Sequence, residues 1–347
     1  MSEAPSPSDS KLASQPLTPE EIADRLVPKT PAVSPDGKAV AFVVAPQSKK
    51  GEHPEQAIWI SRDGAPAEPF TAGTAADDEP RWSPDGTRLA FLSDRAERGS
   101  FRVYLIRRDG GEARPLGDLQ GELQAPEWSP DGTRIALLRK DPESPEEKAR
   151  KDDRDDAIVV DSDPRRNRLW IIDVATGKAR QLTYGTRQVW SFAWAPAGDQ
   201  LAVITTDAPD MNALCEPCDV WLVPAAGGLL RHLARFPDHA DCPVFVEAPE
   251  GAAVAVRTNW HRDDPADSVW LVPMAGGKPR KALPDLAGNV EYNARPPWQP
   301  WECGVAHRGG YARQRLSVRC GDGCPGTADT ERVAPGGKRA VRPWLIR

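Results

Sequence analysis

The sequence predicts an all-β fold, a β-propeller of four-stranded antiparallel blades, about five of which are recognisable. Three observations lead to this prediction: a turn motif recurs along the chain, a strand with a central aromatic residue recurs behind it, and glycine turns follow that strand. The composition agrees, because 28 Gly and 36 Pro among 347 residues supply many turns. We also expect a short N-terminal helix, an irregular C-terminal tail and incomplete closure of the ring.

Composition and charge argue against two classes of partner, membranes and nucleic acids. Hydrophobic residues make up 39% of the chain, the mean hydropathy is -0.55 and no apolar run reaches the length of about 18 residues that a membrane helix needs. The net charge is -6, which disfavours a polyanionic partner. We therefore expect no nucleic-acid partner and no membrane insertion, and the sequence leaves the oligomeric state undetermined.

The N-terminus, residues 1–16, is rich in Ser, Pro and Ala and has no apolar segment after a basic start. It does not resemble a secretory signal, so we expect it to be disordered and the protein to be cytoplasmic. Six cysteines are too few for a disulfide scaffold, and reduced thiols are expected. The first element then begins at Thr18-Pro19-Glu20-Glu21, a capping box that predicts a short helix.

The propeller is predicted over residues 17–292 from a repeated turn. The tetrapeptide Ser-Pro-Asp-Gly begins at Ser34, Ser83 and Ser129, with weaker copies beginning at Ala195 and Ala248. Successive spacings are 49, 46, 66 and 53 residues, close to the period of propeller blades if one insertion is allowed. Pro presets φ for a turn and Gly tolerates positive φ, so each copy should join the first two strands of a blade.

The strands around each turn share a pattern. Trp82, Trp128 and Trp194 precede three of the turns, and alternating apolar strands follow them. A third strand carries an aromatic residue flanked by aliphatic ones, at Trp59, Tyr104, Trp170, Trp221 and Trp270, and a fourth ends in an apolar residue at Phe70, Leu116, Leu182, Leu233 and Leu283. We interpret the tryptophans as packing residues between blades rather than as site residues.

An insertion over residues 140–168 accounts for the long spacing of 66 residues. It is rich in charges of both signs, with prolines near its ends. Two alternatives stay open: an exposed helix from Glu146 to Asp156, or a partly disordered loop. No residue in it points to a particular chemistry.

Residues 293–347 form an atypical basic tail. It holds nine Arg and one Lys against four acids, a net charge of +6, so residues 1–292 carry -12. The pattern stops after Trp298, and Cys303, Cys320 and Cys324 lie beyond it. The tail is interpreted as the product of an altered reading frame in preference to a basic arm or a disordered end, because it does not repeat the few residue types of low-complexity tails.

No catalytic or cofactor-binding residue is assigned. No serine lies in a G-x-S-x-G pattern, and the five histidines, His53, His232, His239, His261 and His307, have no recognisable nucleophile partner. Cys215, Cys218, His239 and Cys242 lie at the outer ends of a predicted hairpin and could bind zinc. A local disulfide or buried thiols are the alternatives, and no metal is assigned.

With these motifs in place, the chain resembles the N-terminal propeller of the prolyl oligopeptidase family of serine peptidases, especially its acylaminoacyl-peptidase-like members. The resemblance covers roughly Leu17 to Tyr292 and includes the leader Leu17-Thr18-Pro19-Glu20-Glu21 and the segment from Asp156 to Asp161. The turn motif alone is less specific, because Tol-type propellers share it.

The resemblance implies a substrate-gating module. In that family the propeller restricts entry to short peptides, while nucleophile, acid and histidine belong to a hydrolase domain that is missing here. We therefore expect short peptides or a hydrolase domain or subunit as partners, no cofactor, and no peptidase activity from a chain truncated near residue 293. The alternative is a free-standing Tol-like propeller that acts as a protein-binding scaffold.

Overall fold

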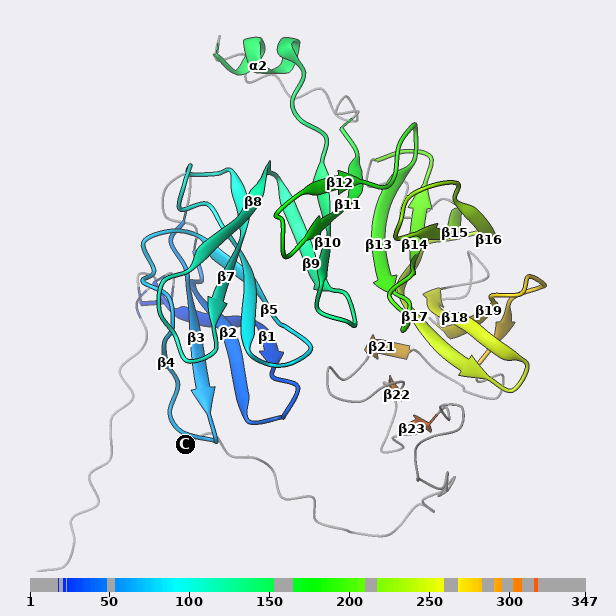
Figure 1. The fold of residues 1–347 in the computed structure, drawn as a ribbon, viewed down its shortest axis with the longest axis horizontal. Helices are drawn as coiled ribbons and strands as arrows, with labels where there is room; N and C mark the ends of the chain where they lie inside the picture. Colours follow the sequence, from blue (N-terminus) through cyan, green and yellow to red (C-terminus); the bar gives the residue numbers. More distant parts are fainter. Residues whose placement is uncertain are drawn as a thin grey trace, which may run out of the picture.

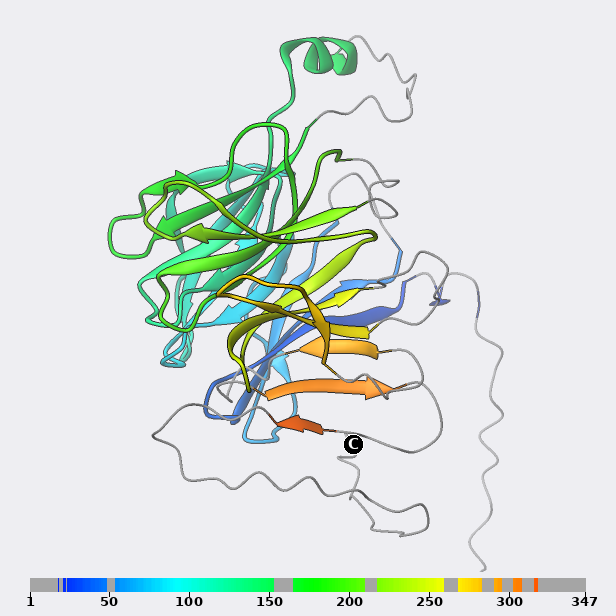
Figure 2. The same ribbon diagram turned by 90° about the vertical axis from the view of Figure 1, so that its right-hand side faces the viewer.

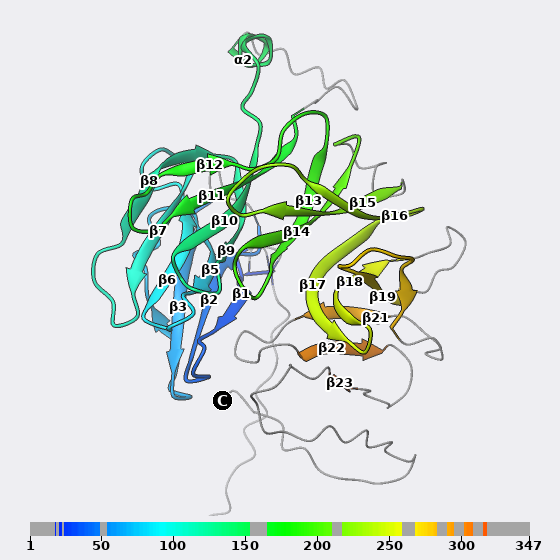
Figure 3. The ribbon, with the colours of Figure 1, turned by 45° about the vertical axis from the view of Figure 1, so that its right-hand side comes forward.

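The structure is a computed structural model and describes residues 18, 21–22, 24–48, 54–152, 165–209, 217–258, 268–282, 290–294, 302–307 and 315–317. Five four-stranded antiparallel sheets follow one another along the chain. They are arranged in an arc, from the blue sheet through green to yellow (Figure 3). This is the predicted all-β propeller, and each sheet is one blade.

The blades consist of consecutive strands. Blade one contains β1 (Leu26–Val33), β2 (Ala39–Pro46), β3 (Ala57–Arg62) and β4 (Glu68–Pro69). Blade two contains β5 (Asp77–Trp82), β6 (Arg88–Ser93), β7 (Phe101–Arg107) and β8 (Arg114–Gly121). Blade three contains β9 (Leu123–Trp128), β10 (Arg134–Lys140), β11 (Asn167–Asp173) and β12 (Ala179–Gln181).

The last two four-stranded blades follow the same plan. Blade four contains β13 (Gln188–Trp194), β14 (Gln200–Thr206), β15 (Cys218–Pro224) and β16 (Arg231–Phe236). Blade five contains β17 (Ala240–Ala248), β18 (Gly251–Thr258), β19 (Ser268–Pro273) and β20 (Arg280–Lys281). Every predicted third strand is therefore confirmed (Figure 1), whereas Leu283, the predicted end of the last fourth strand, lies outside the described residues.

The Ser-Pro-Asp-Gly turns join first and second strands, as predicted, and their side chains close them. In the third copy the Ser129 hydroxyl donates to Asp131 Oδ1 at 2.5 Å and accepts the N–H of Arg134 at 2.9 Å. Gly132 has φ +70°, which a side chain would strain. Although burial raises the pKa of Asp131, hydrogen bonds from Ser129 and Thr133 lower it to about 2.

The tryptophans before the turns link neighbouring blades. The indole N–H of Trp82 donates to the carbonyl of Ala32 at 3.1 Å, and that of Trp194 donates to the carbonyl of Glu127 at 3.2 Å. Each acceptor belongs to the first strand of the preceding blade and stands opposite an alanine of the second strand. The interpretation of these residues as packing residues is thus correct, and the indole adds a hydrogen bond to the buried area.

Blade five departs from the expected register. Ala248 pairs directly with Gly251, so the turn there is two residues tighter than the Ser-Pro-Asp-Gly turns. In blade four, Leu201 lies two residues before the partner of Trp221 on the third strand, and it pairs with Trp194. In blade five, Val254 lies two residues before the partner of Trp270, and it pairs with Phe245. Phe245 therefore takes the position of Trp194. The weak sequence copy at Ala248 is a turn, but it is not equivalent to the others, because the hairpin extends further.

Blade one is covered on one face. The second strands of blades two to four are buried on both faces over most of their length, whereas the second strand of blade one, β2, alternates between buried and half-buried residues. Its buried face, from Ala39 to Ala45, packs against blade two together with Trp82 and Phe91. Val40, Phe42 and Val44 on the other face stay half-buried. Among the strands that the structure describes, blade one packs against one neighbouring blade, blade two, which accounts for this pattern.

A sixth sheet crosses the predicted tail boundary. It contains β21 (Val290–Ala294), β22 (Glu302–His307) and β23 (Arg315–Ser317), and β21 lies beside β17, β18 and β19. These strands differ from the expectation of an irregular tail; the remainder of residues 293–347 lies outside the described part. Among the described strands each sheet pairs consecutive strands only, so no strand of this sheet joins blade one.

Two capping boxes start helical turns. The N–H of Thr18 donates to Glu21 Oε2 at 2.8 Å and the N–H of Glu21 donates to the Thr18 hydroxyl at 3.1 Å, as the leader predicted. In the insertion, Ser144 and Glu147 exchange the same bonds at the start of α2 (Pro145–Asp152). The helical alternative is therefore correct for 145–152, and α2 stands away from the sheets (Figure 2).

Candidate functional site

The two ends of the propeller differ in the length of their connections. Turns between first and second strands and between third and fourth strands meet at one end, which we call the turn end. The ends of the second strands and the starts of the third strands lie at the other end, the loop end, and the connections between them are longer. Residues 49–53, 153–164, 210–216 and 259–267 of these connections lie outside the described part. Because binding residues concentrate on loops held by a rigid scaffold, the loop end is the candidate functional face.

Asp78 is the centre of a polar cluster at the loop end. Its carboxylate accepts hydrogen bonds from Lys29 Nζ and Gln56 Nε2, both at 2.9 Å, and from the Thr30 hydroxyl at 3.4 Å. The three donors belong to blade one and Asp78 to blade two. The cluster therefore ties two blades together and presents one ammonium and one amide beside one carboxylate.

Left-handed backbone recurs in the first strands of the blades, towards the loop end. Thr30, Glu79 and Ala125 have φ of 46°, 50° and 52°, and each lies at a β-bulge four residues before a turn serine. Such a conformation is unusual for residues with a side chain, and bulges re-aim side chains at functional rims. Each of the three precedes a proline, so the sequence carries a signal for this bulge that the turn and strand motifs do not include.

Glu79 connects the bulges of neighbouring blades. Its carboxylate accepts the N–H of Ala125 at 2.9 Å and lies 3.6 Å from the guanidinium of Arg81. Burial raises the pKa of Glu79, although Arg81 and the Ala125 N–H oppose this shift. A carboxyl group with a raised pKa on a propeller rim can hold or release a proton in a range where ordinary carboxyls stay ionised.

A second pair of carboxylates lies deeper in blade two. Asp77 is almost fully buried and accepts two bonds from Arg95, at 2.9 and 3.0 Å. Asp94, equally buried, accepts the N–H of Ala76 at 2.8 Å and a bond from Arg98 at 2.6 Å. Buried carboxylates with this many donors are structural, because removing either partner would leave a buried charge without a counter-charge.

The base of the insertion is held by ion pairs. Arg168 on β11 donates to both oxygens of Asp141, at 2.8 to 3.0 Å, and also binds the carbonyl of Arg187. Arg165 lies 2.6 Å from Glu122 and 3.9 Å from Glu147 at the start of α2. These contacts anchor the two ends of the insertion to blade three.

A hollow of about 440 Å³ lies beside the Asp78 cluster. Its wall combines apolar Val27, Ala45 and Pro46 with the polar groups of Lys29 and Gln56. Hydrophobic walls with a few placed polar groups are typical of ligand sites. Both polar side chains also bind Asp78, so a ligand entering the hollow would meet donors whose direction is already set.

The histidines described by the structure do not form a hydrolytic triad with a serine. His232 Nε2 lies 2.8 Å from Asp219, and its ring makes an edge contact with Trp221 at 4.7 Å between centroids. His239 makes an edge contact with Trp190 at 6.4 Å. His53 and His261 lie outside the described residues, and nothing is described of the His307 side chain.

The proposed zinc ligands are partly described. The hairpin of β15 and β16 exists as predicted, with Cys218 opposite Phe236, and the Cys218 thiol donates to the carbonyl of Asp238 at 3.2 Å. Burial raises the pKa of Cys218 to about 12 and that of Cys242 to about 11. Within the described part, no three His, Cys, Asp or Glu side chains are grouped as metal ligands; Cys215 lies outside it.

Comparison with known proteins shows two kinds of relative. Residues 23–162 match the family model described as the TolB β-propeller domain. A segment of 92 residues is 33% identical to the uncharacterized peptidase YuxL of Bacillus subtilis (strain 168). That match covers 26% of this chain and 14% of the relative. The chain therefore matches a small part of that protein's length.

Solved structures show the same fold. A puromycin-hydrolyzing peptidase of Mycobacterium tuberculosis superposes with a TM-score of 0.59 at 18% identity, covering 86% of this chain and 46% of that one. The acylaminoacyl peptidase of Pyrococcus horikoshii gives 0.58 at 15% identity, with 84% and 44% covered. The β-propeller domain of the Trilobed protease of Pyrococcus furiosus gives 0.52 at 12%, with 82% and 80% covered.

These comparisons confirm the resemblance to peptidase propellers and also relate the chain to TolB. The chain spans less than half of the first two solved peptidases. No helix in the described residues is long and apolar enough to cross a membrane.

Proposed function

We propose that this chain is the substrate-gating propeller of a serine peptidase of the prolyl oligopeptidase type. The observation that carries the proposal is the series of four-stranded blades that superposes on peptidases of known structure. The loop end adds support, because the charged insertion and the hollow beside Asp78 lie there. Short peptides would meet the hollow, and the hydrolase would come from a separate domain or subunit.

The proposal includes the absence of peptidase activity from this chain alone. The imidazole of His232 pairs with Asp219 and not with a serine hydroxyl, so it lacks the nucleophile that acyl transfer needs. We further propose a cytoplasmic location and reduced thiols.

Purified protein should therefore not hydrolyse chromogenic acyl-peptide esters or puromycin. The acylaminoacyl peptidase of Pyrococcus horikoshii serves as a positive control for the esters. Turnover that copurifies with the chain through two different columns would contradict the proposal, because contaminating hydrolases separate from it.

The second candidate is a free-standing propeller that binds proteins. The match of residues 23–162 to the TolB β-propeller domain favours it. The two candidates differ in what the coding sequence holds after the Trp298 codon. If another reading frame there contains a further Asp-Gly turn and a G-x-S-x-G motif, the gating proposal and the altered frame are supported; if neither frame does, the scaffold is favoured.

A further inference from the structure

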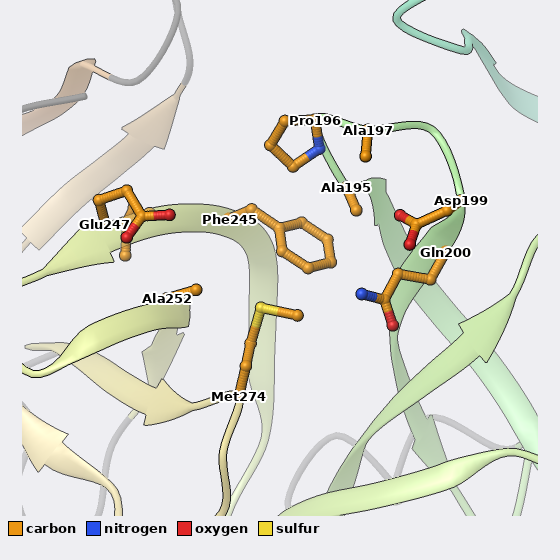
Figure 4. Close-up of a pocket in the computed structure, with 10 residues that line it drawn as sticks. Ala195, Pro196, Ala197, Asp199, Gln200, Phe245, Glu247, Ala252 and Met274 are labelled. Carbon is orange, nitrogen blue, oxygen red and sulfur yellow. The ribbon is translucent and has the colours of Figure 1, made fainter. Parts of the chain in front are cut away.

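A second pocket, of about 220 Å³, lies between blades four and five near the turn end. Phe245 and Met274 of blade five and Gln200 of blade four surround the space from three sides (Figure 4). Asp199 and Glu247 also line it. The pocket is therefore apolar at its base and carries two carboxylates at its rim.

Two other blade interfaces contain a guanidinium at the aromatic ring. Arg108 lies over Trp82 at 5.7 Å from the ring centroid, between blades one and two. Arg134 of blade three lies over Trp194 of blade four at 5.2 Å and donates to the carbonyl of Gly198 at 2.8 Å. Cations are attracted to aromatic faces, more strongly where water is excluded.

The interface between blades four and five lacks this cation. Gln200 is the first residue of β14, as Arg134 is of β10, and Phe245 takes the position of Trp194. Within the described residues no guanidinium lies over Phe245. Arg231 approaches from blade four but donates to the carbonyl of Met274 and does not line the pocket.

The carboxylates at the rim have no partner within the described structure. Neither Asp199 nor Glu247 forms an ion pair or a side-chain hydrogen bond there, and both residues are exposed. Glu250, on the neighbouring turn, is by contrast paired with Arg280 at 2.5 Å. A cation in the pocket would therefore gain two carboxylates and one aromatic ring.

We propose that this pocket binds the guanidinium of an arginine side chain from a peptide. The ligand would take the place that Arg134 occupies at the preceding interface. Its methylene groups would lie against Met274, and its guanidinium would lie against the ring of Phe245 and face Asp199 and Glu247. The pocket lies at the turn end, so the proposal does not depend on a peptidase function.

The probe is N-acetyl-arginine amide, with N-acetyl-citrulline amide as its uncharged analogue of the same shape. Binding is followed by chemical-shift changes of the protein during titration. We expect the arginine probe to bind with a dissociation constant on the order of millimolar and the citrulline probe to bind at least about fivefold more weakly. Equal affinity for the two probes would overturn the proposal.

Three variants locate the site. Gln200→Arg places a guanidinium of the protein itself in the pocket. It should therefore abolish probe binding while leaving the protein folded. The double variant Asp199→Asn/Glu247→Gln should weaken binding by about fivefold or more. The matched control Glu250→Gln removes a carboxylate outside the pocket and should leave the affinity unchanged.

Circular dichroism and the melting temperature verify that each variant is folded. If Gln200→Arg is unfolded, the double carboxylate variant decides the test. Undiminished probe binding by folded Gln200→Arg or by the folded double variant would overturn the proposal.

Discussion

The indole N–H of Trp128 in blade three donates to the carbonyl oxygen of Arg81 in blade two at 3.0 Å. Arg81 stands opposite Ala90, in the register that Ala32 and Glu127 occupy in their own blades. The same bond therefore repeats at three successive interfaces. A tryptophan before the turn couples one blade to the next by both buried area and a directed bond.

Replacing Trp128 by Phe should destabilise the protein by about 1–3 kcal/mol, because the Arg81 carbonyl would lose its donor inside the interface. The measurement is the free energy of unfolding from urea titration. Trp59→Phe is the matched control: the Trp59 indole is half-buried in blade one and makes no hydrogen bond to any residue that the structure describes. Equal losses in the two variants would show that the bond contributes nothing.

Gly117→Ala should destabilise the protein strongly. Gly117 has φ +68°, and a Cβ there would lie 2.0 Å from the carbonyl oxygen of Gly177 in the next blade. Relief of that clash requires the two blades to move apart, and overpacking of this kind costs about 1–3 kcal/mol in addition to the backbone strain. Differential scanning calorimetry measures the loss.

The control for that variant is Gly64→Ala. Gly64 has φ +75° but no atom within 4 Å of the added Cβ, so it reports the backbone strain alone. We expect a cost of about 1–2 kcal/mol there. A loss at Gly117 no larger than at Gly64 would mean that the contact between blades two and three is looser than described.

Glu79→Gln should change the pH dependence of stability. Because burial raises the pKa of Glu79, the native state favours the protonated form. Its contribution is fully present below the unfolded pKa of about 4.3 and is lost as the pH rises through the folded pKa. The stability of the wild type relative to Glu79→Gln should therefore fall as the pH rises above about 4 in urea titrations.

Glu250→Gln is the control of opposite sign. The hydrogen bond from Arg280 lowers the pKa of Glu250, so the wild type should gain stability over this variant as the pH rises through the acid range. Glu250 is exposed, and the gain should be small at physiological salt. A difference between wild type and Glu79→Gln that stays constant with pH would contradict the assignment.

Purified protein should contain no stoichiometric zinc. The Cys218 thiol is buried and donates to the carbonyl of Asp238, which is the arrangement of a protonated thiol and not of a metal-bound thiolate. Elemental analysis checks this expectation. One zinc per chain that is lost in a Cys218→Ala/Cys242→Ala variant would establish the metal site of Cys215, Cys218, His239 and Cys242 instead.

Local sequence patterns were sufficient to predict the blades. Ser129, Asp131 and Gly132 close a turn with their own atoms, and the aromatic residue flanked by aliphatic ones at Trp170 marks a strand in which Leu169 and Ile171 are buried. The capping box at Thr18 is equally local. Each of these features depends on residues within one hairpin or helical turn, so a single sequence contains the information.

The candidate sites depended on contacts between blades. Lys29 and Asp78 meet although 49 residues separate them, and Phe245 shares the register of Trp194 only because the hairpin of blade five extends by two pairs. No local pattern specifies which side chains of neighbouring blades approach each other, since that depends on how sheets stack. The sequence by itself determined the turns, strands and repeat; stacking of the blades decided the Asp78 cluster, the left-handed bulges and the pocket beside Phe245.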